Sequence, residues 1–291
     1  MSTNTASATV SQTDPMSTKE KAVVSRKFGP ETGGDVVFRS SDNVSFHVHQ
    51  KHLEVYAEGF PLAKHTTPSQ NEIIPLSEKS STLEHLFQFM LPQRPPELDG
   101  LDFEQLMALA NASEKYVVYS AQSTCALYMR DFLTSHPEQI LKYAATYHHN
   151  SVIYTLAPQL VMKPLTELAN LLPHDVFVPW SIYRSNFHGL LSALGDACAI
   201  SSTHPQQHKF QEVRWLRKIQ QVKDEIKKDP TKLSQFRTLI YQADLAGEKV
   251  CECHCCNPFK EWVTKVCGDI GKMEDIKIIA RKYLAEKYAR G

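Results

Sequence analysis

The apolar pattern of residues 35–60 changes its period partway along, and this change limits the folds that the chain can adopt. Residues 35–39, DVVFR, are typical of a short strand, and Ser40–Asn43 has residues that favour a tight turn. Residues 44–48, VSFHV, alternate apolar and polar side chains, which predicts a second, half-buried strand. From Leu53 onward the apolar residues follow helical spacing. We therefore expect a β-hairpin that leads directly into a helix, within a fold that mixes strands and helices.

Three histidines lie close together in this stretch: His47, His49 and His52. Imidazole is a common metal ligand, so a metal site is one interpretation. Against it, His47 and His49 would share the polar face of a strand, whereas His52 would lie on the following helix. No nearby carboxylate is placed to orient the rings as a second shell of ligands would. We therefore expect these histidines to serve the fold and predict no metal site there.

Most of the remaining chain is predicted to be helical. Ile73–Leu76 is typical of one more short strand, and Ser80–Met90 has an apolar stripe that ends before a group of prolines. Further helices are expected over about 103–116 and 120–133, and again from Pro137, because proline suits the first turn of a helix. From there to about Ala199 we expect short helices separated by prolines, namely Pro158, Pro164, Pro173 and Pro179.

Two amphipathic helices are predicted in the last third of the chain. Gln206–Lys228 carries four apolar residues at 4-3-4 spacing, namely Trp215, Ile219, Val222 and Ile226. That stripe spans only about two heptads, so a helix packed on its own domain is favoured over a coiled coil. Met273–Arg290 is the last expected helix, and its mixed charges favour a solvated face over a nucleic-acid patch.

Composition limits the classes of partner and compartment. Lys plus Arg equals Asp plus Glu at 32 each in 291 residues, so no overall field attracts nucleic acid or an anionic membrane. No run of about 18 apolar residues predicts a membrane span. The seven cysteines come without a secretory signal pattern, which favours a reduced compartment, cytoplasmic or nuclear. Residues 1–29 are Ser/Thr-rich at their start, and we expect a disordered tail there.

Taken in order, these segments resemble the BTB/POZ domain. The residues that carry the resemblance are Asp35-Val36-Val37-Phe38, Phe46-x-Val48-His49-x-x-x-Leu53, Phe60, Ile73-Ile74-Pro75-Leu76, Thr82-Leu83-x-x-Leu86-Phe87-x-Phe89-Met90, Leu106-x-x-Leu109-Ala110-x-x-x-x-Lys115-Tyr116 and Cys125. The variant with PLSE before one helix and PxxPPxL after it resembles the BTB proteins found in many copies in mushroom-type fungi.

The resemblance implies an α+β fold, in which the tail is followed by three regions. These are a BTB/POZ-like domain over 30–135, a helical BACK-like extension over 136–200 and a helical C-terminal region over 201–291. It also implies that six residues are structural, namely Asp35, Phe46, Val48, His49, Leu53 and Phe60. Among them, His49 would tie the hairpin to the first helix by a hydrogen bond between its ring and the backbone.

The function implied by the resemblance is protein–protein interaction, because BTB domains pair with themselves or bind protein partners. Some recruit a cullin ubiquitin ligase, so a substrate adaptor is an alternative. Two positions depart from that pattern: Ala57 stands where a serine is frequent, and Gln70 precedes Glu72 where cullin-recruiting members have an apolar residue. Homodimerisation and another protein partner both remain open.

The densest group of chemically reactive side chains is the run CECHCC at 251–256. Cys253 and Cys256 have the spacing of a zinc knuckle, with Cys251 and Cys255 as further candidate ligands. No second ligand pair stands at a fixed distance, so small buried thiols are the favoured interpretation and no cofactor is predicted. A zinc-stabilised regulatory protein stays open as an alternative.

Sequence patterns of common enzymes are missing from the chain. There is no GxxxxGK[ST], GxGxxG, GxSxG or HExxH, and no paired nucleophile and base stands out. We therefore predict no catalytic residues and a non-enzymatic interaction module.

Overall fold

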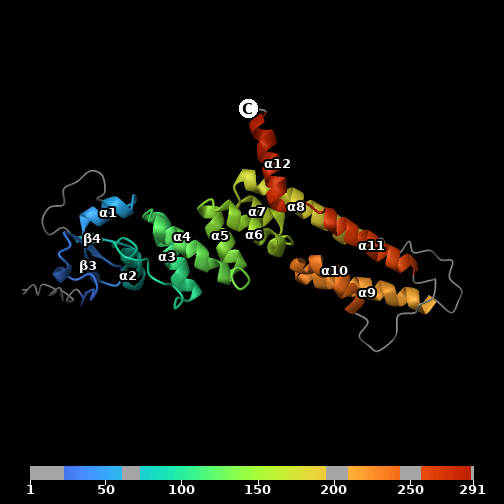
Figure 1. The fold of residues 1–291 in the computed structure, drawn as a ribbon, viewed down its shortest axis with the longest axis horizontal. Helices are drawn as coiled ribbons and strands as arrows, with labels where there is room; N and C mark the ends of the chain where they lie inside the picture. The colour runs from blue at the N-terminus through green and yellow to red at the C-terminus, as the bar shows by residue number, and fades with distance from the viewer. Residues whose placement is uncertain (1–22, 61–72, 195–208, 243–256, 290–291) are drawn as a thin grey trace, which may run out of the picture. The chain divides into compact units, whose positions relative to one another are not determined.

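The computed structural model describes residues 23–60, 73–194, 209–242 and 257–289, and it combines a small sheet with many helices (Figure 1). The chain forms two compact units, which divide between Tyr128 and Met129. The mixed α and β character expected from the sequence is therefore present. None of the described helices is both long enough and apolar enough to cross a membrane.

The N-terminal unit is built on a four-stranded sheet in the order β1-β3-β2-β4. Its strands are β1 (Val23–Val24), β2 (Val36–Arg39), β3 (Val44–Val48) and β4 (Ile73–Pro75). The predicted hairpin is confirmed, because β2 and β3 pair antiparallel with Phe38 opposite Phe46. Asn43 closes the turn with a φ of 62°, a left-handed conformation that asparagine tolerates better than most residues. The two outer strands pair parallel to their neighbours.

The prediction that residues 1–29 form a disordered tail is wrong for residues 23–29. Strand β1 pairs with β3, and the backbone N–H of Ser25 donates to the Ser45 carbonyl at 2.9 Å. Phe28 is buried against other aromatic rings. Residues 23–29 therefore join the domain through the backbone pairing of β1 and through the burial of Phe28, which is 3% exposed. Residues 1–22 lie outside the described part.

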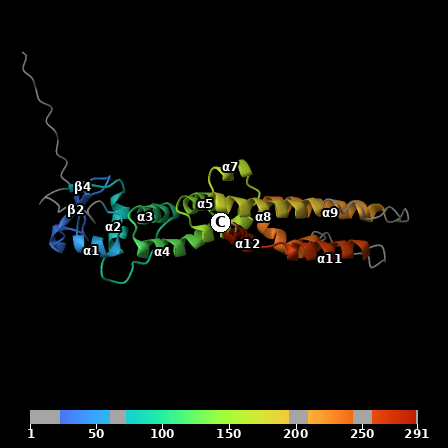
Figure 2. The same cartoon turned by 90° about the horizontal axis from the view of Figure 1, so that it is seen from above.

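Helices cover the sheet and extend the N-terminal unit. They are α1 (Gln50–Tyr56), α2 (Ser80–Gln88), α3 (Phe103–Lys115) and α4 (Tyr119–Tyr128), with a short 3-10 helix η1 (Pro30–Thr32) before β2. Figures 1 and 2 show α3 and α4 lying side by side. Asp102 begins α3 with a capping box, in which it accepts from the Gln105 N–H at 2.8 Å.

Phe87 of α2 is the centre of the N-terminal core. Its ring centroid lies 5.3–6.0 Å from those of four other phenylalanines, which are Phe28, Phe38, Phe46 and Phe60. Because each of these rings comes from a different segment, the cluster joins the hairpin, α2 and the chain on either side of them. All five side chains are buried, so this cluster holds the fold and offers little surface to a partner.

The C-terminal unit is helical. Its elements are η2 (Met129–Phe132), α5 (Pro137–Thr146), α6 (Asn150–Leu160), α7 (Leu165–Ala169), α8 (His174–Ala193), α9 (Lys209–Lys228), η5 (Pro230–Gln235), α10 (Phe236–Gln242), α11 (Asn257–Lys272) and α12 (Ile276–Ala289). The regions expected over 136–200 and 201–291 pack together, since α8 contacts α11 and α12, and α6 contacts η5.

Two expected breaks are corrected in this unit, because α6 contains Pro158 and α8 contains Pro179, and one helix prediction is confirmed. Helix α8 runs through Pro179 for 20 residues, although we expected a break there. Pro179 and Trp180 are both buried, so packing outweighs the hydrogen bond that proline removes. The predicted stripe on α9 packs within its own unit, where Ile226 is fully buried and the Trp215 ring stacks on Phe259 at 4.9 Å.

Candidate functional site

His49 and Asp35 fix the start of α1. The Asp35 carboxylate accepts a hydrogen bond from the backbone N–H of Gln50, the first residue of the helix, at 2.7 Å. A negative charge at this position also complements the helix dipole. The Nε2 atom of His49 lies 3.0 Å from the carbonyl oxygen of Thr32. The ring therefore ties the helix start to η1, the turn before the hairpin.

Of the other two histidines, His47 lies in β3 opposite Val37, and His52 lies on α1. The ring of His52 lies edge-on to that of His49, with centroids 5.1 Å apart. Burial, followed by the charges of His49 and Lys51, lowers the pKa of His52, so its ring is neutral near pH 7. Within the described part of the chain, no three His, Cys, Asp or Glu side chains are grouped so that they could hold a metal ion.

The apolar residues of the expected family motif lie in the core. Phe46, Val48, Leu53 and Phe60 are each no more than 3% exposed. They cannot contact a partner without unfolding the domain, so functional surface has to be sought elsewhere in the unit.

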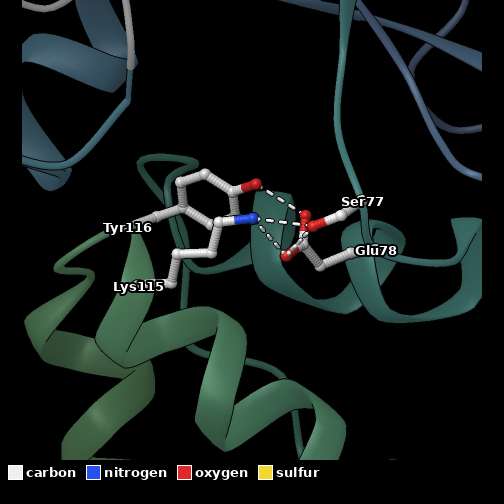
Figure 3. Close-up of polar contacts among 4 residues, drawn as sticks. All are labelled: Ser77, Glu78, Lys115 and Tyr116. Atoms are coloured by element: carbon white, nitrogen blue, oxygen red, sulfur yellow. Dashed lines mark hydrogen bonds and ion pairs between the residues drawn. The ribbon is translucent and has the colours of Figure 1, made fainter.

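A polar cluster joins the segment after β4 to the end of α3 (Figure 3). We call Ser77, Glu78, Lys115 and Tyr116 the Glu78 cluster. The Tyr116 hydroxyl donates to one carboxylate oxygen of Glu78 at 2.6 Å, and Lys115 Nζ donates to the other at 2.7 Å. Lys115 Nζ also donates to the Ser77 hydroxyl at 2.8 Å. The sequence contains these residues as PLSE and KY, but nothing local indicates that two pairs 38 positions apart should meet.

The surroundings of the Glu78 cluster make it rigid. The Tyr116 ring stacks on Phe60 with centroids 4.2 Å apart, and the Glu78 carbonyl accepts from the Ser41 N–H at 2.9 Å. Gly59 passes so close to Tyr116 that a Cβ atom on it would lie 2.8 Å from the tyrosine backbone, so only glycine fits. The cluster thus connects the hairpin turn, the end of α1 and the end of α3.

The charges in this cluster favour one protonation state. Burial by itself would raise the pKa of Glu78, but hydrogen bonds from Lys115, Tyr116 and Ser77 outweigh burial and lower it. Burial and the hydrogen bond to Glu78 raise the pKa of Tyr116 to about 12. Glu78 is therefore an ionised acceptor and Tyr116 a neutral donor near pH 7. This arrangement is structural, because the carboxylate already has three partners.

Both edge strands of the sheet carry exposed apolar side chains. In β1, Val23 is 62% exposed and Val24 is 42% exposed, and in β4 Ile73 is 42% exposed. Among the described residues each of these strands has a neighbour on one side only. Val55 of α1 is exposed as well, at 65%. Periodicity gave no signal for β1, because two residues are too few to show an alternation.

The four candidate zinc ligands, Cys251, Cys253, Cys255 and Cys256, lie outside the described residues. Of the other cysteines, Cys267 is half-buried in α11 and Cys125 is buried in α4. Burial raises the pKa of the Cys125 thiol to about 12, which makes it an unreactive core residue.

Comparison with known proteins does not identify a family for this chain. No protein-family model, no curated protein and no solved structure matches the chain.

Proposed function

We propose that this chain is a non-enzymatic protein-interaction protein and that its N-terminal unit is a BTB/POZ-type domain. The observation that carries the proposal is the pair of edge strands with exposed valine and isoleucine side chains. The order of hairpin, α1, β4, α2 and α3, with the residues that resemble the family, supports the choice of domain. The compartment proposed is the cytoplasm or the nucleus.

An exposed strand edge binds protein in a defined way. Its unpaired backbone N–H and C=O groups add a strand from a partner, and neighbouring side chains select the sequence of that strand. Of the two edges, β1 is the better candidate, because Pro75 of β4 has no N–H to donate. Burying one valine side chain contributes about 1.5 kcal/mol. Val23 is 62% exposed and Val24 is 42% exposed, so covering what remains of both would contribute about 1.5 kcal/mol before ordering costs are subtracted.

Self-association is the first form of this function to test. Sedimentation velocity of the full-length protein over a concentration series should show a dimer that dissociates on dilution. The double variant Val23→Lys/Val24→Lys should shift the equilibrium to monomer, because lysine on an edge strand opposes strand addition. Both valines are exposed, so folding should change by less than about 0.5 kcal/mol.

Two further variants make the test specific. Ile278→Lys changes an exposed apolar residue of the C-terminal unit and should behave as the wild type. Val55→Lys separates docking on α1 from strand addition, because Val55 is as exposed as Val23 but lies on a helix. Dimers that are insensitive to the β1 substitutions would overturn the choice of the β1 edge.

A pull-down of full-length tagged protein identifies other partners and tests the adaptor alternative. A stoichiometric cullin among the captured proteins would make the chain a ligase adaptor, although Gln70 stands where cullin-recruiting members have an apolar residue. Capture of another recurrent protein would leave a scaffold or regulatory module.

A further inference from the structure

Helix α4 exposes apolar side chains on the face that is turned away from the core. Ala121 and Cys125 form the buried side of the helix, which packs against α3. Tyr119, Ser123 and Leu127 follow one another at a spacing of four residues on the opposite side, so they make one stripe along the helix, which we call the α4 stripe. Tyr119 and Leu127 are each 57% exposed, and Ser123 between them is exposed too.

The sequence of α4 is unusual for a helix at the surface. Its ten residues, YSAQSTCALY, include no charged side chain, unlike the other described helices of the N-terminal unit. A helix that faces water normally carries charged and polar side chains on its outer face. The outer face of α4 instead presents an aromatic ring and a leucine, and the centre of a protein interface is rich in aromatic and apolar groups and poor in charge. The α4 stripe therefore has the composition of a contact surface.

The chemistry of the stripe favours the same stripe of a second copy as its occupant. A charged partner surface would lose water without gaining an opposite charge, because α4 offers none. The stripe also has the same order in both directions, with a small residue between two large ones. When two stripes meet antiparallel about a two-fold axis at Ser123, Tyr119 of each copy lies against Leu127 of the other. Glu58 lies beside the Tyr119 hydroxyl, and this arrangement keeps the two Glu58 carboxylates at opposite ends of the contact.

We propose that α4 is a second self-association face, on which the α4 stripes of two copies pair antiparallel around Ser123. The contact is small, since each copy contributes mainly one tyrosine and one leucine, so it forms only at high protein concentration. It does not depend on the β1 edge. A chain with both contacts links dimers into larger assemblies, because two different two-fold contacts on one copy leave a free face at each end.

Charged side chains at Ser123 test the two-fold pairing directly. The full-length variant Val23→Lys/Val24→Lys serves as the background, because it removes the β1 contact. Sedimentation velocity of this variant should show a weak dimer at high concentration. Adding Ser123→Asp or Ser123→Lys should weaken that dimer by at least about tenfold, since like charges then face each other across the axis. An equimolar mixture of the Asp and Lys proteins should restore the dimer, because opposite charges now meet.

Further variants make the result specific to α4. Ser192→Asp and Ser192→Lys place the same charges at another exposed helical serine, in α8, and should leave the dimer unchanged. Leu127→Gln should weaken the dimer and retain the fold, because Leu127 is exposed. A monomer at every concentration, a dimer that neither Ser123 variant weakens, or a mixture that stays monomeric would each overturn the proposal. A strong dimer that the β1 substitutions leave unchanged would instead contradict the β1 edge, so the two failures are distinguishable.

Discussion

Removing the hydroxyl of Tyr116 tests the Glu78 cluster most sharply. Tyr116→Phe keeps the ring that stacks on Phe60 and deletes only the 2.6 Å hydrogen bond to Glu78. A hydrogen bond to a charged group contributes about 1.5–3 kcal/mol. The Glu78 side chain is 14% exposed, so water can partly replace the lost donor, and we expect a loss of about 1.5–2 kcal/mol. Lys115→Met should cost less than about 1 kcal/mol, because that side chain is 48% exposed.

The pH dependence provides a second readout of the Tyr116 hydroxyl, whose pKa is raised first by burial and then by the hydrogen bond to Glu78. The pKa of Tyr116 is raised from 10.0 to about 12, which corresponds to about 3 kcal/mol in favour of the neutral form in the folded state. This contribution is fully present below pH 10 and is lost as the pH rises from 10 towards 12. The pKa of Glu78 is lowered, so its contribution is present above its ordinary value of 4.5 and is lost as the pH falls through the folded pKa.

The assay has to report the N-terminal unit alone. All three tryptophans, Trp180, Trp215 and Trp262, belong to the C-terminal unit, so tryptophan fluorescence does not report this unit. Urea unfolding followed by the ¹³C-methyl resonance of Met90, which is fully buried just after the end of α2, gives the free energy directly. Equal stability of Tyr116→Phe and wild type at pH 7, with parallel losses between pH 10 and pH 12, would refute the reasoning.

Four further outcomes are expected. Asp42→Ala should destabilise the N-terminal unit by about 1 kcal/mol, because the Asp42 carboxylate accepts a hydrogen bond from the N–H of Ser80 at the start of α2. The pKa of Asp42 is lowered from 3.8 to about 2, so this contribution is lost as the pH falls from 3.8 towards 2. Val117→Gly should stabilise the unit by about 0.5–1 kcal/mol, since a β-branched residue is strained at its φ of 53°. Lys163→Met should cost the C-terminal unit about 1 kcal/mol by removing ion pairs with two glutamates. A chelator should leave the melting temperature unchanged if Cys251–Cys256 holds no zinc.

Each of these outcomes has its own measurement. Urea unfolding followed at Met90 checks Asp42→Ala and Val117→Gly, and unchanged stability of both would contradict the assigned cap and strain. Tryptophan fluorescence follows Lys163→Met, with Lys260→Met as an exposed control in the same unit. Metal analysis of the purified protein accompanies the chelator melt, and one bound zinc with a chelator-induced drop in melting temperature would establish the zinc-stabilised alternative.

Local patterns predicted the elements whose causes are local. The alternation in residues 44–48 and the turn at Asn43 specify the hairpin, and the structure has it. Pro137 begins α5, and Phe103 begins α3, each at the expected residue. The expected helix over 120–133 is present in part, since α4 ends at Tyr128 and a 3-10 helix follows.

Features that depend on distant contacts were not predictable in the same way. Strand β1 is two residues long and exists through its pairing with β3, so no periodicity could indicate it. The Glu78 cluster joins residues that are far apart in sequence, and only the folded chain brings them together. Pro179 was expected to end a helix, but burial of Trp180 holds α8 together. In each case tertiary packing outweighs the local preference.

The most direct test of the interaction function compares three baits in parallel pull-downs from the native cells. Full-length wild type and Val23→Lys/Val24→Lys are captured in parallel, with Ile278→Lys as the matched control, and bound proteins are quantified by mass spectrometry. We predict that wild type and the control retain the same second copy or partner, and that the β1 variant loses it. Identical recovery by all three baits, or no bound protein with any of them, would contradict an interaction module that acts through the β1 edge.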